Sequence, residues 1–447
     1  MASYRGKFQY LSQNGSVTQQ GACQVQFDDE TFTLTPESGA PLVSDLGDVD
    51  AVIAADYEIQ LPLYTGNTLK LQQFGKSFEN LSRELLESYR KRTLQCLLLE
   101  DMEEVDRFTG GFVLEPHAAH PVSGPAEIRL FKSNLAVLPN ASQAFQWRLA
   151  DIAQVRFDVQ NFEIGLASNG DRLRFNRLAK RTELLDTKLR QAMDTLAANG
   201  GQALHSILPF LNPDQLQSAM TVLPEGHSAA AGKLAKVHPR IPEVLATNAV
   251  DEALRPYYDE LLRRTASGSL FVGYKLIRQE NRSLQGAHQE DADLGSDESC
   301  DATAGADENA PDVLYWFFFP FAAKNGGPGN LVAWEASSRS GRATYFFRLM
   351  ESGQEALLND SSKAADAVGR GIGRITRVLG MVNFRRRPIY LSEDDLTRDV
   401  SFHRYAIAAR RIPDLRLVRT AFLGRAIHTS FEAWREQVNT IVAKTGL

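Results

Sequence analysis

The sequence predicts a mixed α+β protein in which antiparallel sheets are each closed by a helix. Two observations carry this prediction. A pattern of apolar residues in the N-terminal half recurs after a shift of 103 residues, and such a recurrence indicates repeated structural units. Within each copy the apolar spacing changes from two, typical of a strand, to 3.6, typical of a helix. The 447 residues, 43% hydrophobic and 23% charged, suit a globular protein of about two to four domains.

The first copy begins with a predicted hairpin. Val25 and Phe27 alternate with polar residues before the turn 28–30, and Phe32 and Leu34 alternate with polar residues after it. This alternation predicts two strands with one buried face. A second hairpin and a helix are expected to follow, with apolar positions at Ile59, Leu61, Leu63, Leu69 and Leu71 for the hairpin and at Phe78, Leu81, Leu85 and Tyr89 for the helix.

The second copy repeats this order. The pattern matches Ile59, Leu61 and Leu63 with Phe162, Ile164 and Leu166, and it places one inserted residue in the turn 168–172. That turn contains an Asn-Gly pair, which is a strong hairpin signal. The closing helix of this copy is expected to bury Leu185, Leu189 and Met193.

Residues 130–193 resemble bacterial pleckstrin-homology-like (PH-like) domains. The step Leu149-Ala-Asp-Ile-Ala-Gln-Val155, followed by a hairpin and a helix, carries the resemblance, and residues 46–52 match it more weakly. The resemblance covers about residues 5–200 and attaches no catalytic motif. It implies binding of peptides, proteins or acidic lipids. The lipid-binding members use a basic first hairpin loop, whereas residues 28–30 are acidic and residues 132–134 contain a single lysine, so phosphoinositide binding is not supported.

The sequence divides into four segments. Two PH-like domains are expected at 1–100 and 101–200, a helical connector at 201–268, and an α+β domain at 269–447. An insert at about 283–312 has nine acids and no Lys or Arg between residues 290 and 312. Such a composition buries too little apolar surface to fold, so the insert is expected to be disordered.

The last domain is predicted to contain strands and then helices. The expected elements are a helix at 250–264 leading into the domain, strands at 270–276 and 313–321, a hairpin at 331–335 and 343–349, and helices at about 354–379 and 423–441. This order leaves open whether the domain is a third PH-like unit.

The C-terminal end is basic although the whole chain has a net charge of −6. Residues 363–447 contain 16 Lys plus Arg and 8 Asp plus Glu, or +8. The candidate binding residues are the arginines on one predicted helix face and in the turn after it: Arg370, Arg374, Arg377, Arg385, Arg386 and Arg387. They indicate either a surface for an acidic ligand or nucleic acid, or a solvated helix face paired with nearby acids.

Neither a metal site nor a cofactor site is predicted. Three widely spaced cysteines provide no disulfide framework or zinc spacing, and His117 and His120 are assigned to a connecting loop. The glycines of 369–373 have the spacing of a phosphate-binding loop but fall within a predicted helix, so helix packing is favoured. The common motifs of hydrolases, metalloproteases and P-loop enzymes are missing from the sequence.

These observations favour a non-enzymatic adaptor or scaffold. Its PH-like domains would bind a protein or peptide through sheet edges or through the groove between the closing helix and the sheet. The alternatives are a protein that binds nucleic acid or another polyanion, and an enzyme of unrecognised type. A cytoplasmic location is expected, because the N-terminal residues resemble no secretory signal and no apolar run reaches the length of about 20 residues that a membrane helix needs.

Overall fold

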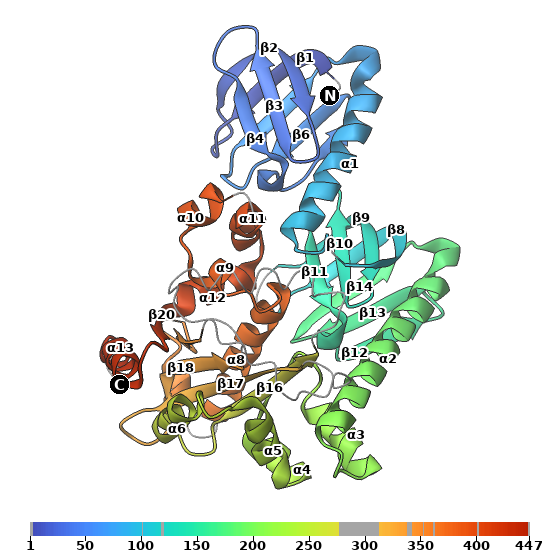
Figure 1. Cartoon of the computed structure of the whole chain (residues 1–447). Helices are drawn as coiled ribbons and strands as arrows, with labels where there is room; N and C mark the ends of the chain where they lie inside the picture. Colours follow the sequence, from blue (N-terminus) through green and yellow to red (C-terminus); the bar gives the residue numbers. More distant parts are fainter. Residues whose placement is uncertain are drawn as a thin grey trace, which may run out of the picture. The chain divides into compact units, whose positions relative to one another are not determined.

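The protein is mixed α+β, as the sequence predicts. The computed structural model describes residues 3–100, 102–117, 120–276, 313–337, 342–351, 353–360, 363–399 and 402–445. These residues form three antiparallel sheets (Figure 1). The chain divides into unit 1, Met1–Leu196 with Glu393–Ile412, and unit 2, Ala197–Ser392 with Pro413–Leu447. The predicted disordered insert at 283–312 lies outside the described residues.

The first sheet of unit 1 has seven strands in the order β4-β3-β2-β1-β7-β6-β5. The strands are β1 (Ser3–Leu11), β2 (Val17–Phe27), β3 (Thr31–Pro36), β4 (Leu42–Asp45), β5 (Ile53–Ala55), β6 (Glu58–Pro62) and β7 (Thr68–Gln72). A short 3-10 helix, η1 (Leu46–Asp48), connects β4 to β5, and α1 (Phe78–Cys96) closes the sheet.

The predicted β2–β3 hairpin is confirmed. Phe27 pairs with Phe32 directly across it, so the alternating apolar residues share one buried face. The carboxylate of Asp28 accepts hydrogen bonds from the backbone N–H groups of Glu30 and Thr31, at 2.9 and 2.7 Å. These bonds close the turn and lower the pKa of Asp28.

The second sheet of unit 1 has the same strand order, β11-β10-β9-β8-β14-β13-β12. Its elements are β8 (Glu104–Glu115), β9 (Val122–Phe131), β10 (Asn134–Pro139), β11 (Phe145–Arg148), η3 (Leu149–Asp151), β12 (Gln154–Asp158), β13 (Glu163–Ser168), β14 (Asp171–Asn176) and α2 (Thr182–Ile207). Leu46 and Leu149 begin the two 3-10 helices and are both fully buried. Each curled antiparallel sheet with its closing helix is consistent with a PH-like fold.

The expected alignment of the two copies is wrong at β6 and β13. Ile59 pairs with Leu71 in the first sheet, and Ile164 pairs with Phe175 in the second, so Ile164 is the counterpart of Ile59. Phe162, the expected counterpart, lies in the β12–β13 turn at φ 52° with 52% of its surface exposed. A shift by two residues keeps each side chain on the same face of a strand, so the alternating pattern fitted both alignments.

Unit 1 also contains a helical hairpin from the C-terminal part of the chain. Its helices are α10 (Glu393–Arg398) and α11 (His403–Arg411). The sequence predicts that this segment belongs to the last domain, at 269–447, whereas its contacts group it with the first two sheets.

Unit 2 is built on a six-stranded antiparallel sheet in the order β15-β16-β17-β18-β19-β20. The strands are β15 (Ser228–Ala230), β16 (Phe271–Leu276), β17 (Val313–Ala322), β18 (Pro328–Ala336), β19 (Ala343–Phe347) and β20 (Phe422–Ile427). The strands thus follow one another in chain order. This differs from the order in the two sheets of unit 1.

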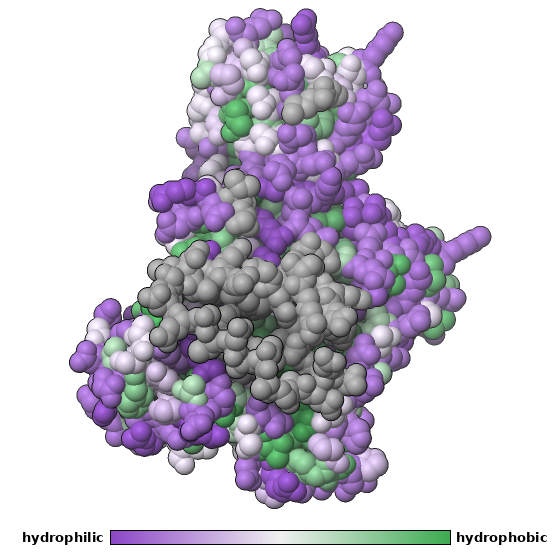
Figure 2. All heavy atoms as spheres, viewed as in Figure 1, coloured by the Kyte–Doolittle hydropathy of each residue, from purple (hydrophilic) through white to green (hydrophobic). Residues whose placement is uncertain are grey.

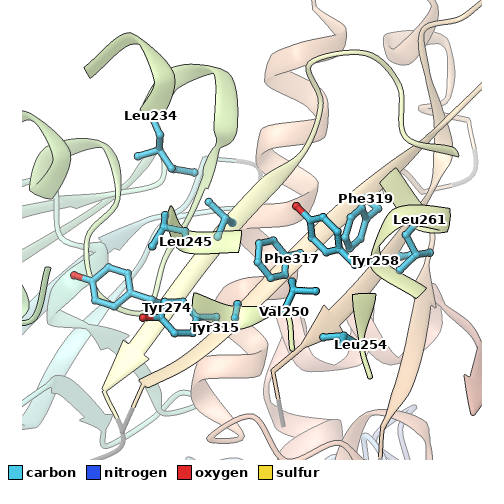
Figure 3. Packing of buried hydrophobic residues seen from close by; sticks show 14 of the residues in the cluster. Leu234, Leu245, Val250, Leu254, Tyr258, Leu261, Tyr274, Tyr315, Phe317 and Phe319 are labelled. Atoms are coloured by element: carbon cyan, nitrogen blue, oxygen red, sulfur yellow. The ribbon is translucent and has the colours of Figure 1, made fainter. Parts of the chain in front are cut away.

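Helices pack against this sheet and cover the central strand β17 on both faces. They are α3 (Pro213–Val222), α4 (Ala231–Val237), α5 (Arg240–Ala249), α6 (Arg255–Arg264), α7 (Ala356–Asn359), α8 (Ala364–Met381), α9 (Arg387–Tyr390), α12 (Pro413–Ala421) and α13 (Phe431–Ala443). Phe317 and Phe319 contact Tyr258 of α6, with ring centroids 5.1 and 5.4 Å away (Figure 3). Trp316 contacts Phe384, which follows α8, at 4.5 Å. Burial on both faces explains why this strand is an uninterrupted apolar run.

The helix predicted at 423–441 is only partly correct. Residues Phe422–Ile427 form strand β20, and the helix begins at Phe431. The side chain of Ser430 accepts a hydrogen bond from the N–H of Ala433 and so caps the helix start. Apolar residues recur every three or four positions through both the strand and the helix, and this spacing favours a helix throughout. The spacing does not reveal that the first part pairs with β19.

The helix predicted at 354–379 is two helices. Asp360 has an extended backbone, with φ −88° and ψ 104°, and it ends α7 before α8 begins at Ala364. The helix predicted at 250–264 begins only at Arg255, with a proline in its first turn.

Of the glycines at 369–373, Gly371 serves close helix packing, as predicted, whereas Gly369 does not. A Cβ at Gly371 would lie 2.9 Å from the carbonyl oxygen of Leu349, whereas a Cβ at Gly369 would have no heavy atom within 4 Å. We expect Gly371→Ala to lower the free energy of unfolding of unit 2. Gly369→Ala should raise it by about 0.5–1 kcal/mol, because alanine favours the helix. Urea unfolding of the full chain measures both, and equal stabilities would contradict the close packing.

Candidate functional site

Helix α1 organises the candidate site, because its side chains have three different surroundings. The row that faces the sheet is buried in the core and comprises Leu81, Leu85 and Tyr89. A second row borders a cavity beside the β2–β3 turn and comprises Glu84, Glu87, Ser88 and Lys91. A third row meets η1 and α11 and comprises Arg92, Thr93 and Cys96.

The cavity between α1 and the β2–β3 hairpin has a volume of about 390 Å³, and we call it the acidic groove. It is lined by Phe27, Asp29, Glu84, Glu87, Ser88 and Lys91. Lys91 forms an ion pair with Asp29. Three carboxylates and one ammonium group therefore line a cavity that includes one aromatic ring. The part of α1 visible in Figure 2 is correspondingly hydrophilic.

Tyr4 fixes one side of the acidic groove. Its hydroxyl donates a 2.7 Å hydrogen bond to Glu84, and its ring stacks on Phe27 with centroids 6.1 Å apart. Burial, together with the neighbouring carboxylate, raises the pKa of Tyr4 to about 12. Tyr4 therefore stays a neutral phenol at neutral pH and keeps its proton for the hydrogen bond to Glu84.

A second surface lies around η1, and we call it the α11 surface: Gly47, Asp48, Val49, Thr93, Cys96 and Glu100. Arg411 of α11 enters it and is only 5% exposed. Its guanidinium donates to the carbonyl oxygen of Val49 and to the hydroxyl of Thr93, the latter at 3.3 Å. It also lies over the ring of Tyr89, with 5.8 Å from its central carbon to the ring centroid. One arginine thus contacts the loop after η1 and two residues of α1.

Two further arginines of α11 pair with acids of unit 1. Arg410 forms ion pairs with Asp48, the last residue of η1, and with Glu393 at 2.7 Å. Arg404 forms an ion pair with Glu100. Ion pairs therefore hold α11 near both of its ends.

Gly47 allows α11 to approach η1. A Cβ at this position would lie 2.9 Å from Cγ2 of Ile407 and 2.8 Å from the sulfur of Cys96. Neither distance is compatible with a side chain. Cys96 is fully buried here, and burial raises the pKa of its thiol to about 12.

Arg92 fixes η1 against α1. It is 4% exposed and holds Asp45 with two hydrogen bonds, of 2.9 and 2.5 Å. Asp45 also accepts a 2.6 Å hydrogen bond from the backbone N–H of Gly47. Both oxygens of this carboxylate are thus used to place the 3-10 helix that presents Asp48 to α11.

Sequence reasoning did not identify the α11 surface. Neither Arg410 nor Arg411 is among the candidate binding residues that the sequence indicates. One signal was present: the first copy has Gly47 where the second has Ala150. A glycine inside an otherwise matching apolar pattern indicates a close approach by another part of the chain.

The structure separates the six predicted arginines of unit 2. Arg370, Arg374 and Arg377 share helix α8, and Arg370 is exposed. Arg374 forms an ion pair with Glu351 at 3.1 Å. Arg377 forms one with an acid of α12, Asp414, at 3.4 Å.

The arginines of 385–387 lie at the start of α9. Arg386 is 8% exposed, and its guanidinium carbon lies 5.9 and 5.7 Å from the ring centroids of Trp334 and Tyr345. Arg385 and Arg387 are partly exposed. The six arginines therefore do not share one exposed face. Their role in binding stays a prediction.

Comparisons with known proteins provide little further information. The chain matches no known family, and no curated protein is significantly similar to it. Among solved structures, it is similar to the C-terminal domain of an unknown protein from Leishmania infantum, with 13% identity over 24% of this chain and 97% of that chain and a TM-score of 0.20. It is also similar to the Spt16D Pob3N heterodimer, with 19% identity, coverages of 38% and 84%, and a TM-score of 0.16. Scores this low support no argument about function.

The described residues contain neither a membrane-spanning helix nor a metal-binding cluster. None of their helices is both long and apolar enough to cross a membrane. They also contain no group of three or more His, Cys, Asp or Glu side chains arranged to hold a metal ion.

The burial of Cys96 reports whether α11 is bound. In a Cys23→Ala/Cys300→Ser background, we expect iodoacetamide to alkylate Cys96 very slowly at pH 8, because a buried thiol with a pKa of about 12 provides almost no thiolate. Arg411→Ala should raise the alkylation rate at least tenfold by loosening α11. Arg398→Glu, a change at a side chain of the same hairpin that is 79% exposed, is the control and should leave the rate unchanged. Equal rates in all three proteins would contradict this.

Arg386 and Arg370 are predicted to differ in their effect on stability. Arg386→Glu places a carboxylate in a buried site beside two aromatic rings, so the free energy of unfolding of unit 2 should fall by more than about 2 kcal/mol. Arg370→Glu changes an exposed side chain and should have little effect. Thermal or urea unfolding of the full chain tests this, and an equally small effect of both changes would show that Arg386 is not structural.

Proposed function

We propose that this protein is a non-enzymatic adaptor that binds a protein or peptide partner through the first of two PH-like units. The acidic groove is the single observation that carries the proposal. It lies between the closing helix α1 and the β2–β3 hairpin, where the family resemblance leads us to expect a peptide.

The groove fits a basic peptide segment. Its volume of about 390 Å³ lies within the range of about 300–1,000 Å³ typical of ligand sites. Phe27 offers an apolar surface for the methylene groups of a lysine or arginine, and Glu84 and Glu87 offer acceptors for the charged end. The same charges would repel an acidic lipid headgroup. This supports a protein partner rather than a phosphoinositide.

Selection from a displayed library of random peptides on the immobilised full chain tests the proposal. We expect the selected peptides to be enriched in Lys and Arg. Glu87→Arg should weaken their binding at least tenfold, because it reverses the charge of one acceptor and adds a cation to the groove. Glu79→Arg, at another exposed glutamate of α1 outside the groove, is the matched control and should change affinity less than twofold.

Two results would count against the adaptor. One is that peptides are selected whose binding is the same in Glu87→Arg and in the unchanged protein. The other is that the full chain binds duplex DNA with an affinity that falls steeply with salt and is lost in Arg370→Glu. That second result would favour the alternative of a polyanion-binding protein, with α8 as its surface.

A further inference from the structure

A buried glutamate of α6 gathers three arginines around its carboxylate. Glu260 is buried, and glutamate is rarely buried unless it is paired. Arg263 and Arg264 follow it by three and four residues on the same helix face, and each has a guanidinium nitrogen within 2.8 Å of the carboxylate. Arg435 of α13 approaches the same carboxylate to 3.9 Å. We call these four residues, which all belong to unit 2, the arginine cluster.

Packing between α6 and α13 sets the position of the arginine cluster. Tyr257, one turn before the glutamate, contacts Trp434 of α13 with ring centroids 5.1 Å apart. Trp434 is fully buried, so the next residue, Arg435, is held beside α6. One turn further along, Arg264 donates a 2.9 Å hydrogen bond to the side-chain oxygen of Asn439 of α13. The two helices are therefore joined on both sides of the cluster.

The arginine cluster carries more positive than negative charge. Among the described residues, Glu260 is the only carboxylate within ion-pair distance of the three arginines. Three guanidinium groups around one carboxylate leave two positive charges without an acidic partner. This surplus is local, because the chain as a whole has a net charge of −6.

The three arginines differ in how many donors they keep for a ligand. Arg264 is partly buried, and its Nε, Nη1 and Nη2 groups all donate to Glu260 or Asn439, so its role is structural. The side chains of Arg263 and Arg435 are 69% and 57% exposed. Arg435 donates no hydrogen bond to any residue that the structure describes. Because one buried carboxylate holds both exposed guanidinium groups near it, a ligand that lies over the carboxylate can contact both, and less side-chain entropy is lost on binding.

A phosphate monoester has the charge and the acceptors that this arrangement requires. It carries close to two negative charges at neutral pH, and its oxygens accept paired hydrogen bonds from guanidinium groups. The surroundings favour a single phosphate. Asp259, Glu432 and Glu436 are exposed on the same two helices, and their carboxylates would repel a membrane surface or a nucleic acid, which both present many phosphates side by side.

We propose that the arginine cluster binds a phosphorylated serine or threonine of a protein or peptide partner. Arg263 and Arg435 donate hydrogen bonds to the phosphate. Recognition of a phosphorylated side chain by clustered arginines is an established mode of peptide binding. The proposal goes beyond the acidic groove and does not rest on it, because the groove lies in unit 1 and favours a cationic segment.

Arginine side-chain NMR of the full chain tests the site directly. The probe is N-acetyl-O-phosphoserine amide, and N-acetylserine amide is its control. The phosphorylated probe should shift the Nε–H signals of Arg263 and Arg435 with one common dissociation constant, and it should leave the signal of Arg370, which is exposed on α8, unchanged. Arg435→Gln should weaken binding about tenfold, because it removes one charge and its donors. Arg370→Gln is the matched control and should leave the affinity unchanged.

Two results of this titration would overturn the proposal. One is that the probe shifts neither Arg263 nor Arg435. The other is that Arg435→Gln, shown to be folded by its unfolding curve, binds the probe as tightly as Arg370→Gln does. In that case the phosphate is attracted by surface charge in general and not by the arginine cluster.

The charge of the phosphate provides a second test. A phosphate monoester loses its second negative charge as the pH falls through about 6, so the probe should bind several-fold more weakly at pH 5 than at pH 7.5. Dimethyl phosphate keeps one negative charge at both pH values and should bind weakly and equally at both. The cluster carboxylate Glu260 and the nearby Asp259, Glu432 and Glu436 are present in both titrations. An equal change for the two ligands would place the titration in these groups and contradict recognition of the dianion.

A comparison of peptides with vesicles identifies the source of the phosphate. We expect the full chain to bind phosphoserine and phosphothreonine peptides from an array with random flanking residues, and not their unphosphorylated counterparts. It should not sediment with phosphatidylcholine vesicles that contain phosphatidic acid, which ends in the same phosphate monoester. Sedimentation that Arg435→Gln abolishes, together with no binding of phosphopeptides, would assign the cluster to a lipid headgroup and overturn the peptide ligand.

Discussion

The first sheet and its closing helix α1 depend on the buried ion pair between Arg92 and Asp45 for their arrangement around η1. Arg92 comes from the C-terminal part of the closing helix and Asp45 from the end of β4, so the pair joins the helix to the turn that links the two halves of the sheet. Because Asp45 also binds the N–H of Gly47, the pair sets the position of η1. With η1 fixed, Asp48 and the carbonyl of Val49 are held in place as acceptors for Arg410 and Arg411 of α11.

The same closing helix separates two surfaces of different chemistry. On one side it offers carboxylates beside an aromatic ring in a cavity, and on the other it offers a threonine and a buried thiol next to η1. Both surfaces favour cationic side chains. They differ in shape, since the groove is a cavity that can take an extended segment, whereas the α11 surface is shaped around a glycine that a helix can cover.

The spacing of apolar residues predicted those elements that residues close together in the chain determine. The β2–β3 hairpin, the closing helices and the run of β17 follow from apolar spacing that neighbours in the chain determine. Spacing could not fix the alignment at Phe162, since a shift by two residues preserves the pattern. It could not recognise β20, since that strand is defined by pairing with β19, about 80 residues earlier in the chain. The α11 surface was missed for the same reason: Asp48 and Arg410 are 362 residues apart, and neither is unusual by itself.

The repeat explains why the α11 surface belongs to the first copy only. When the buried leucines of the two closing helices are aligned, Arg92 corresponds to Leu196, and Asp45 at the end of β4 corresponds to Arg148 at the end of β11. The second copy therefore lacks a counterpart of the Arg92–Asp45 pair, which positions η1 in the first copy. Arg148 instead forms an ion pair with Asp151, the counterpart of Asp48, with 3.2 Å between Nε and Oδ2. Ala150 adds a side chain where Gly47 has none. An arginine-bearing helix at this position would meet the carboxylate of Asp151, which is already paired with Arg148, and the methyl group of Ala150. The two sheets therefore share one strand order but differ in the chemistry that they offer to a helix.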